Sequence, residues 1–185
     1  MLRLATLAGL LTILLLAAPA AATVVVPLTR AELTGRSDLV VRATVVGQQS
    51  QWNDDHSQIV TLTRLRVDAW VKGASPQELV LEQIGGSVDG LTSRIAGEAY
   101  VQRGQQAVFF LRVQGARVYL TALAMSVYYL DAAPSGQLMV RRDLSQLTFA
   151  RPTNGQYVVA EAPVEISETL EHLLADVTSI VRGAR

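Results

Sequence analysis

The feature that most constrains the fold is a long alternation of side-chain types from Ile59 to Lys72. One set of alternate positions holds only apolar residues and threonines: Ile59, Thr61, Thr63, Leu65, Val67, Ala69 and Val71. The other set holds the charges and some apolar residues: Arg64, Arg66, Asp68 and Lys72, with Val60, Leu62 and Trp70. Because successive side chains of a strand point to opposite faces, this pattern predicts one long strand whose first set faces a core. The polar segment 52–57 before it predicts a hairpin loop to a second strand at 39–49.

Further short apolar segments, separated by turn residues, predict a mainly β chain. We expect these strands at residues 78–84, 105–113, 117–124, 127–130 and 138–142. The last segment changes to helical spacing, which predicts an amphipathic helix over about residues 166–182 with Ser167 as its N-cap. The fold expected from this order is a small Greek-key (OB-like) barrel with a C-terminal amphipathic α-helix, forming a single domain over residues 23–185.

Residues 1–22 have the pattern of a secretory signal peptide. Arg3 is followed by an uncharged run from Leu4 to Ala18, and the small residues Ala20 and Ala22 fit a cleavage site after Ala22. The alternative is an uncleaved anchor helix, but the run is shorter than the roughly 20 residues that a spanning helix needs. We therefore expect an exported protein, periplasmic or extracellular, without a membrane span in the mature chain.

Composition limits the chemistry that such a chain can perform. There are no cysteines, so the domain has neither disulfides nor thiolate chemistry nor a cysteine-based zinc site. The 16 basic and 16 acidic residues balance, which gives no electrostatic reason to expect nucleic acid or anionic lipid as a partner.

Two parts of the sequence carry a resemblance to a known family. They are Ser37–Val45 with Trp52, Ile59–Thr61 and Val71–Gly73, and then Gly104–Leu111. These pieces resemble a family of exported, mostly uncharacterised bacterial proteins, over about two-thirds of the mature chain. At the level of the fold alone, the pattern is similar to the OB-type barrel of metalloproteinase-inhibitor and netrin-like domains. Inhibitors of that class use an amino-terminal cysteine that chelates zinc, and this chain has none, so no inhibitory residue has a counterpart here.

Three groups of residues were considered for catalysis or metal binding. Gly85–Asp89 is close to a G-x-S-x-G nucleophile elbow around Ser87, but a helix should follow the serine and the sequence predicts a loop. The segment Asn53–His56 offers oxygen ligands for a cation, although these residue types also stabilise turns. Glu168, His172 and Asp176 are spaced four apart on the expected helix, which is typical of a solvated face. We expect no catalytic residue, metal ligand or cofactor from these patterns.

The remaining hypothesis is a binding surface on the charged face of the long strand. Its candidate residues are Trp52, Arg64, Arg66 and Trp70, with Tyr128 and Tyr129 as further aromatic anchors. The function expected is therefore a non-enzymatic exported binding module, with a protein or peptide partner and the loops 51–57 and 85–97 beside the strand. A small hydrolase or metal-dependent enzyme that uses the Gly85–Gly90 loop, and a structural envelope component, are the alternatives.

Overall fold

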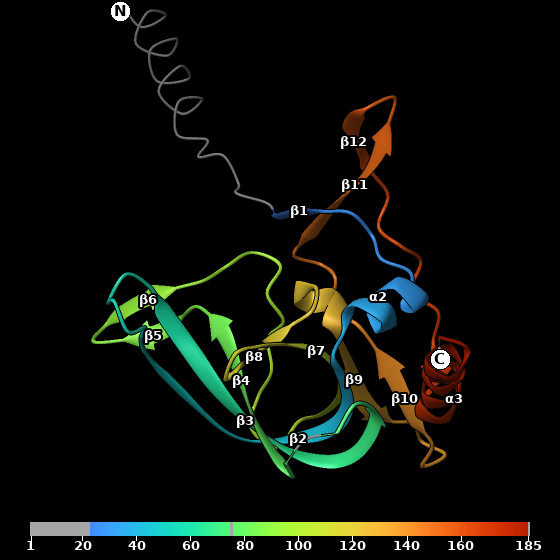
Figure 1. Cartoon of the computed structure of the whole chain (residues 1–185), viewed down its shortest axis with the longest axis horizontal. Coiled ribbons are helices and arrows are strands. Elements are labelled where there is room, and N and C mark those ends of the chain that lie inside the picture. Colours follow the sequence, from blue (N-terminus) through green and yellow to red (C-terminus); the bar gives the residue numbers. More distant parts are fainter. Residues whose placement is uncertain (1–22, 75, 185) are drawn as a thin grey trace, which may run out of the picture.

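The computed structural model describes residues 23–74 and 76–184, and the signal peptide expected at residues 1–22 lies outside this range. The chain is mainly β, as the alternation predicts, and its centre is a strongly curved sheet (Figure 1). Five strands form the curved part: β2 (Leu39–Trp52), β3 (Ile59–Lys72), β4 (Glu78–Ile84), β7 (Gln106–Gln114) and β8 (Arg117–Leu120).

The pairing of these five strands explains the barrel-like shape. β2, β3 and β4 pair antiparallel in sequence order, and β7 returns to pair with the other edge of β2. β8 pairs antiparallel with β7 and meets β4 in parallel at one residue pair, Leu81 and Val118. The sheet thus comes round on itself in a Greek-key order, yet this single contact does not close it, which is typical of the partly open OB type.

The main sheet extends beyond the barrel on the far side of β7. The added strands are β9 (Val127–Ala132), β10 (Leu138–Arg141) and the short β13 (Glu168–Thr169), which is the outer edge. A 3-10 turn, η1 (Leu123–Ser126), precedes β9.

Two apolar cores lie on opposite faces of the sheet. The first fills the barrel, where the inward side chains of β2, β3 and β7, such as Val41, Leu65 and Phe109, are fully buried. The second lies outside the barrel, where Val40 and Phe110 of the sheet pack beneath helices α2 (Arg30–Arg36) and α3 (Leu170–Gly183). Because alternate residues of β2 and β7 enter different cores, these strands read as continuous apolar runs.

Helix α3 begins four residues later than the sequence analysis expected. Thr169, rather than Ser167, caps it by accepting a hydrogen bond from the backbone N–H of His172. The residues before the cap are held elsewhere, because Glu168 and Thr169 pair with β10 as β13. Ile166, which was expected on the apolar stripe of the helix, is 79% exposed instead.

A second, three-stranded sheet projects from the barrel. It consists of β1 (Thr23–Val25), β11 (Leu147–Thr153) and β12 (Gln156–Ala160), with β11 in the middle. Asn154 and Gly155 form the two-residue turn between β11 and β12, and both have positive φ, 50° and 77°, as a type I′ hairpin turn requires. The tip of this hairpin stands well clear of the rest of the chain in Figure 1.

A small hairpin covers one end of the barrel. It consists of β5 (Gly86–Val88) and β6 (Leu91–Ser93), and it lies against β2 and β3. No helix within residues 23–74 and 76–184 is long and apolar enough to cross a membrane.

Candidate functional site

The four residues expected to form a binding surface do not form one patch. Directly paired residues share a face, so Trp52 lies on the face of its partner Ile59, whereas Trp70 pairs with Val41, a core residue of β2, near the other end of β3. Eleven residues separate Ile59 from Trp70, which places the two tryptophans roughly 35 Å apart along the strand. Arg64 and Arg66 lie on the outer face of β3, but register shifts between β2 and β3 interrupt the alternation before Trp70, which is 36% exposed.

Arg64 and Arg66 both contact neighbouring residues of the same sheet. The Arg64 guanidinium lies over Gly47, where an added Cβ would be 3.0 Å from Nη2. Arg66 donates to Asp68 at 3.4 Å and to the Thr44 hydroxyl at 3.3 Å, and Thr44 in turn donates to Asp68 at 2.7 Å. These contacts are what a solvated strand face requires.

Tyr128 and Tyr129 cannot act as surface anchors, so this part of the expectation is wrong. The two side chains are 5% and 3% exposed. Both are buried although they are adjacent, because β9 has a core on each face: Tyr128 enters the outer core and Tyr129 the barrel. The Tyr129 hydroxyl donates to the Tyr100 carbonyl at 2.9 Å, and burial raises the pKa of Tyr129 to about 12.

The polar loop after Trp52 satisfies its own hydrogen bonds. The Asn53 side-chain oxygen accepts from the backbone N–H groups of Ser57 and Gln58, both at 3.0 Å. Asp55 accepts from the Ser57 N–H and hydroxyl, and these bonds hold the pKa of Asp55 below its usual value. Within the described part of the chain, no group of three or more acidic, histidine or cysteine side chains could hold a metal ion.

Ser87 lacks the surroundings of a catalytic nucleophile. It lies in β5, and a tight turn leads to β6 where a nucleophile elbow would continue into a helix. Its hydroxyl is 2.8 Å from that of Thr92, on the paired strand. The glycine before it is required by close packing, because a Cβ at Gly86 would lie 2.4 Å from the Ser50 hydroxyl.

The structure instead brings the 85–97 loop and the β2–β3 hairpin together around a polar cleft. This cleft has a volume of about 640 Å³ and lies at the end of the barrel under the β5–β6 hairpin. The inward face of β3 changes there from Leu65 to the threonines 63 and 61, and β4 changes from Leu81 to Gln83. The lining includes apolar residues such as Ile84, Ile95 and Val101. Its polar part combines hydroxyl and amide groups with one acid and one base: Gln48, Ser50, Thr61, Gln83, Ser87, Thr92, Ser93, Gln146, Glu98 and Arg94.

Glu98 and Gln83 form the most buried polar pair of the cleft. The Gln83 side-chain amide donates to Glu98 Oε1 at 2.9 Å and to the Ala99 carbonyl at 2.8 Å. Burial raises the pKa of Glu98, and the hydrogen bond from Gln83 opposes this only in part. Neither residue was predicted as part of a site, because neither belongs to a motif and they lie 15 positions apart in the sequence.

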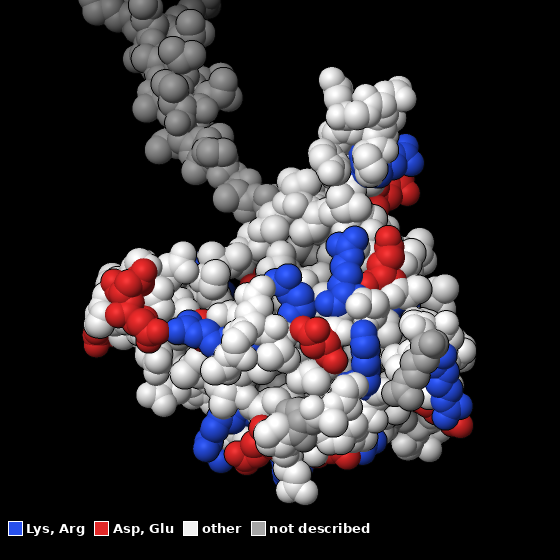
Figure 2. All heavy atoms as spheres, in the orientation of Figure 1, with Lys and Arg blue, Asp and Glu red and all other residues white. Residues whose placement is uncertain are grey.

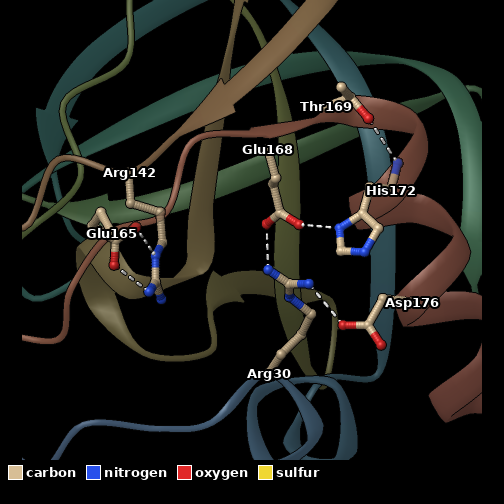
Figure 3. Close-up of polar contacts among 7 residues, drawn as sticks. All are labelled: Arg30, Arg142, Glu165, Glu168, Thr169, His172 and Asp176. Atoms are coloured by element: carbon tan, nitrogen blue, oxygen red, sulfur yellow. Dashed lines mark hydrogen bonds and ion pairs between the residues drawn. The ribbon is translucent and has the colours of Figure 1, made fainter.

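A second polar cluster joins the two helices to the edge of the sheet (Figure 3). Arg30 of α2 donates to Glu168 of β13, and to Asp176 of α3 at 2.7 Å. Glu168 also lies 2.8 Å from His172 Nδ1. Burial lowers the pKa of Arg30, but the bond to Asp176 and the nearby Tyr128 and Glu168 outweigh this and raise it.

The expectation that Glu168, His172 and Asp176 share a solvated helix face is therefore only partly right. His172 is 71% exposed at its side chain, but Glu168 is 12% exposed and lies outside the helix. The guanidinium groups of Arg30 and Arg142 lie 5.8 and 4.9 Å from the centre of the Tyr128 ring. These contacts hold α2 and α3 against the second core, so the cluster has a structural role.

The projecting hairpin carries an exposed apolar surface. Tyr157 and Val159 of β12 are 72% and 79% exposed, and Val158 is 38% exposed. No residue from Pro152 to Ala160 carries a charge, and Figure 2 shows the hairpin without charged side chains, which gather only at its base. The Asn-Gly pair at 154–155 is the sequence signal from which this hairpin could have been predicted.

Comparisons of this chain with protein-family models, with curated proteins and with solved structures found no match.

Proposed function

We propose that the protein is a non-enzymatic binding module that acts outside the cytoplasm and captures a partner protein at the free edge of β12. The partner contributes an extended, apolar segment that adds to the projecting sheet as a further strand. The observation that carries this proposal is the exposure of an uncharged, largely apolar strand at the edge of the β1–β11–β12 sheet.

Exposed edges of this kind are normally protected in proteins. Charged side chains, prolines, bulges or covering loops usually prevent a strand edge from pairing with another chain. β12 has neither a charge nor a proline, and it pairs regularly with β11 over five residue pairs. Such an edge favours recognition by strand addition, in which the backbone gives affinity and alternate side chains give specificity.

The turn type indicates which backbone groups of β12 are available. A two-residue type I′ turn makes Thr153 and Gln156 a hydrogen-bonded pair, and such pairs alternate along an antiparallel ladder. The N–H groups of residues 156, 158 and 160 therefore point to β11, and those of Tyr157 and Val159 point to the free edge. A partner strand would pair with the latter two.

The extracytoplasmic setting rests on the sequence of residues 1–22. The uncharged run and the small residues near Ala22 have the signal-peptide pattern. In that setting, an apolar strand edge can meet partners after the chain has folded.

The test is affinity capture with the Val159→Pro variant. Proline there removes one outward N–H while it leaves the β11–β12 hydrogen bonds in place. The purified full-length protein is immobilised, exposed to the extracytoplasmic fraction of its own cells, and its retained proteins are identified by mass spectrometry. Tyr100→Ala, which removes an equally exposed tyrosine far from β12 in sequence, is the matched control.

Support requires a stoichiometric partner that the wild type and Tyr100→Ala retain and Val159→Pro loses. Equal retention by all three proteins, or retention of nothing above an unrelated β-barrel control, refutes the proposal. Sedimentation of the protein alone separates one further case. If the wild type forms a dimer that Val159→Pro abolishes, the occupant of the edge is a second copy and the partner proposal fails.

A further inference from the structure

The cleft under the β5–β6 hairpin contains hydrogen-bonding groups that the fold itself leaves unused. Both N–H groups of the Gln83 amide are occupied, by Glu98 and by the Ala99 carbonyl. Its oxygen accepts no hydrogen bond from the described residues, although the residue is only 8% exposed. This oxygen is not one of the buried atoms without a partner in the described part of the chain, so it is open to the cleft, where it can accept a hydrogen bond from a ligand.

The directions of the hydrogen bonds between two hydroxyl groups of the cleft can also be assigned. The Thr61 hydroxyl donates to the Gly85 carbonyl at 2.7 Å, so it must accept from Ser50 at 2.9 Å. The Ser50 oxygen therefore keeps its acceptor capacity. Together with Gln83 and the second oxygen of Glu98, it forms a group of acceptors on one side of the cleft.

The rest of the lining supplies donors, an aromatic ring and little net charge. Gln48, Gln146, Ser87 and Thr92 carry groups that can donate and accept. The lining contains one basic residue, Arg94, and one acidic residue, Glu98, so its charges give no preference for a phosphate or another anion. Tyr100 is one of the lining residues and is 72% exposed, so its ring is free to contact a ligand beside these polar groups.

From this combination we infer that the cleft is a binding site for a neutral saccharide. Each sugar hydroxyl both donates and accepts, which matches the mixed hydroxyl and amide lining, and adjacent hydroxyls can donate to the neighbouring oxygens of Gln83 and Glu98. The Tyr100 ring would lie against the apolar face of a sugar ring. The volume of about 640 Å³ lies within the range of small-ligand sites, which often occur at the mouths of β-barrels. This site is separate from the edge of β12 and does not depend on the proposed protein partner.

The test is titration of the purified full-length protein with maltose, cellobiose and di-N-acetylchitobiose, followed by calorimetry and by NMR shifts of backbone amides. We expect at least one disaccharide to bind with a dissociation constant on the order of 1 mM or lower. Tyr100→Ala should weaken this binding about tenfold, because the stacking surface is lost. Glu98→Gln should weaken it severalfold, because a charged acceptor becomes a neutral one. Tyr157→Ala removes an equally exposed tyrosine on the projecting hairpin and should leave the affinity unchanged.

Three outcomes would overturn the inference. The first is that none of the three disaccharides binds at 20-fold above that concentration. The second is that Tyr100→Ala and Tyr157→Ala lower the affinity equally, because binding would then not be located in the cleft. The third is that trialanine shifts the amides of residues 83–101 more strongly than any disaccharide, which would identify the cleft as a peptide site.

Discussion

Replacement of Arg30 by methionine tests whether the cluster in Figure 3 holds the helices on the sheet. The side chain of Glu168 is 12% exposed and that of Arg30 is 24% exposed, so the variant leaves a largely buried carboxylate without its strongest partner. A hydrogen bond to a charged group contributes about 1.5–3 kcal/mol. The bond to Asp176, which is 42% exposed, adds less than about 1 kcal/mol.

We therefore expect Arg30→Met to lower the free energy of unfolding by about 2.5 kcal/mol, after allowance for the remaining contact of Glu168 with His172. In a domain of this size, that loss corresponds to a fall of about 5–10 °C in Tm. Urea denaturation followed by circular dichroism and by tryptophan fluorescence measures it. The double variant with Glu168→Gln should recover part of the loss, since the unpaired charge is then removed.

Arg141→Met is the matched control for this experiment. Arg141 also donates to a carboxylate, Asp131, at 2.6 Å and also lies over a tyrosine ring, at 5.2 Å from Tyr129. The two side chains of this ion pair are 56% and 54% exposed, so its loss should cost less than about 1 kcal/mol. If Arg30→Met and Arg141→Met destabilise the protein equally, burial does not determine the strength of these pairs and the reasoning is refuted.

Three further predictions concern the cleft and the second core. Gly86→Ala should cost about 2–3 kcal/mol, because φ is 135° and the new Cβ would lie 2.4 Å from the Ser50 hydroxyl; Gly90→Ala, where nothing lies within 4 Å, should cost less in the same denaturation assay. Glu98→Gln should raise stability at neutral pH, because burial raises the pKa of Glu98 in the folded protein. The folded state then binds this proton more tightly than the unfolded state, so the contribution of Glu98 to stability is fully present below about pH 4.5 and is lost as the pH rises through its folded pKa. Denaturation midpoints of wild type and Glu98→Gln that differ equally at pH 4 and pH 7 would contradict this. Leu173→Ala should lower the free energy of unfolding by about 3 kcal/mol, because this side chain of α3 is fully buried in the second core. Hydrogen exchange of the α3 amides should become faster in the variant.

The sequence predicted those parts of the fold in which neighbouring residues carry the information. The alternation of β3 follows from the local period of two, and the partner strand β2 follows from the polar turn between them. The predicted start of α3 was wrong, because Ile166 fits the helical period but Glu168 pairs with Val140 in the sheet, so the helix begins only after this pairing. Local periodicity contains no information about such a pairing.

The candidate site was harder to predict for the same physical reason. Arg30 and Glu168 are 138 positions apart, so their contact exists only through the tertiary fold. Gln83 and Glu98 are closer, but their pairing depends on the turn of the β5–β6 hairpin between them. A short strand was expected at residues 157–159, but its exposure was not predicted, because Tyr157, Val158 and Val159 form a continuous apolar run without alternation, which usually indicates a buried strand.

The pairing of β1 with β11 has a consequence for the order in which the chain can fold. Thr23 pairs with Leu147, so the first described strand finds its place only after most of the chain has been synthesised. Contacts between such distant segments carry a high entropic cost and form slowly, whereas the β2–β3 hairpin can form from adjacent residues. The barrel is therefore expected to assemble first, and the projecting sheet, with β12 at its edge, to be completed last.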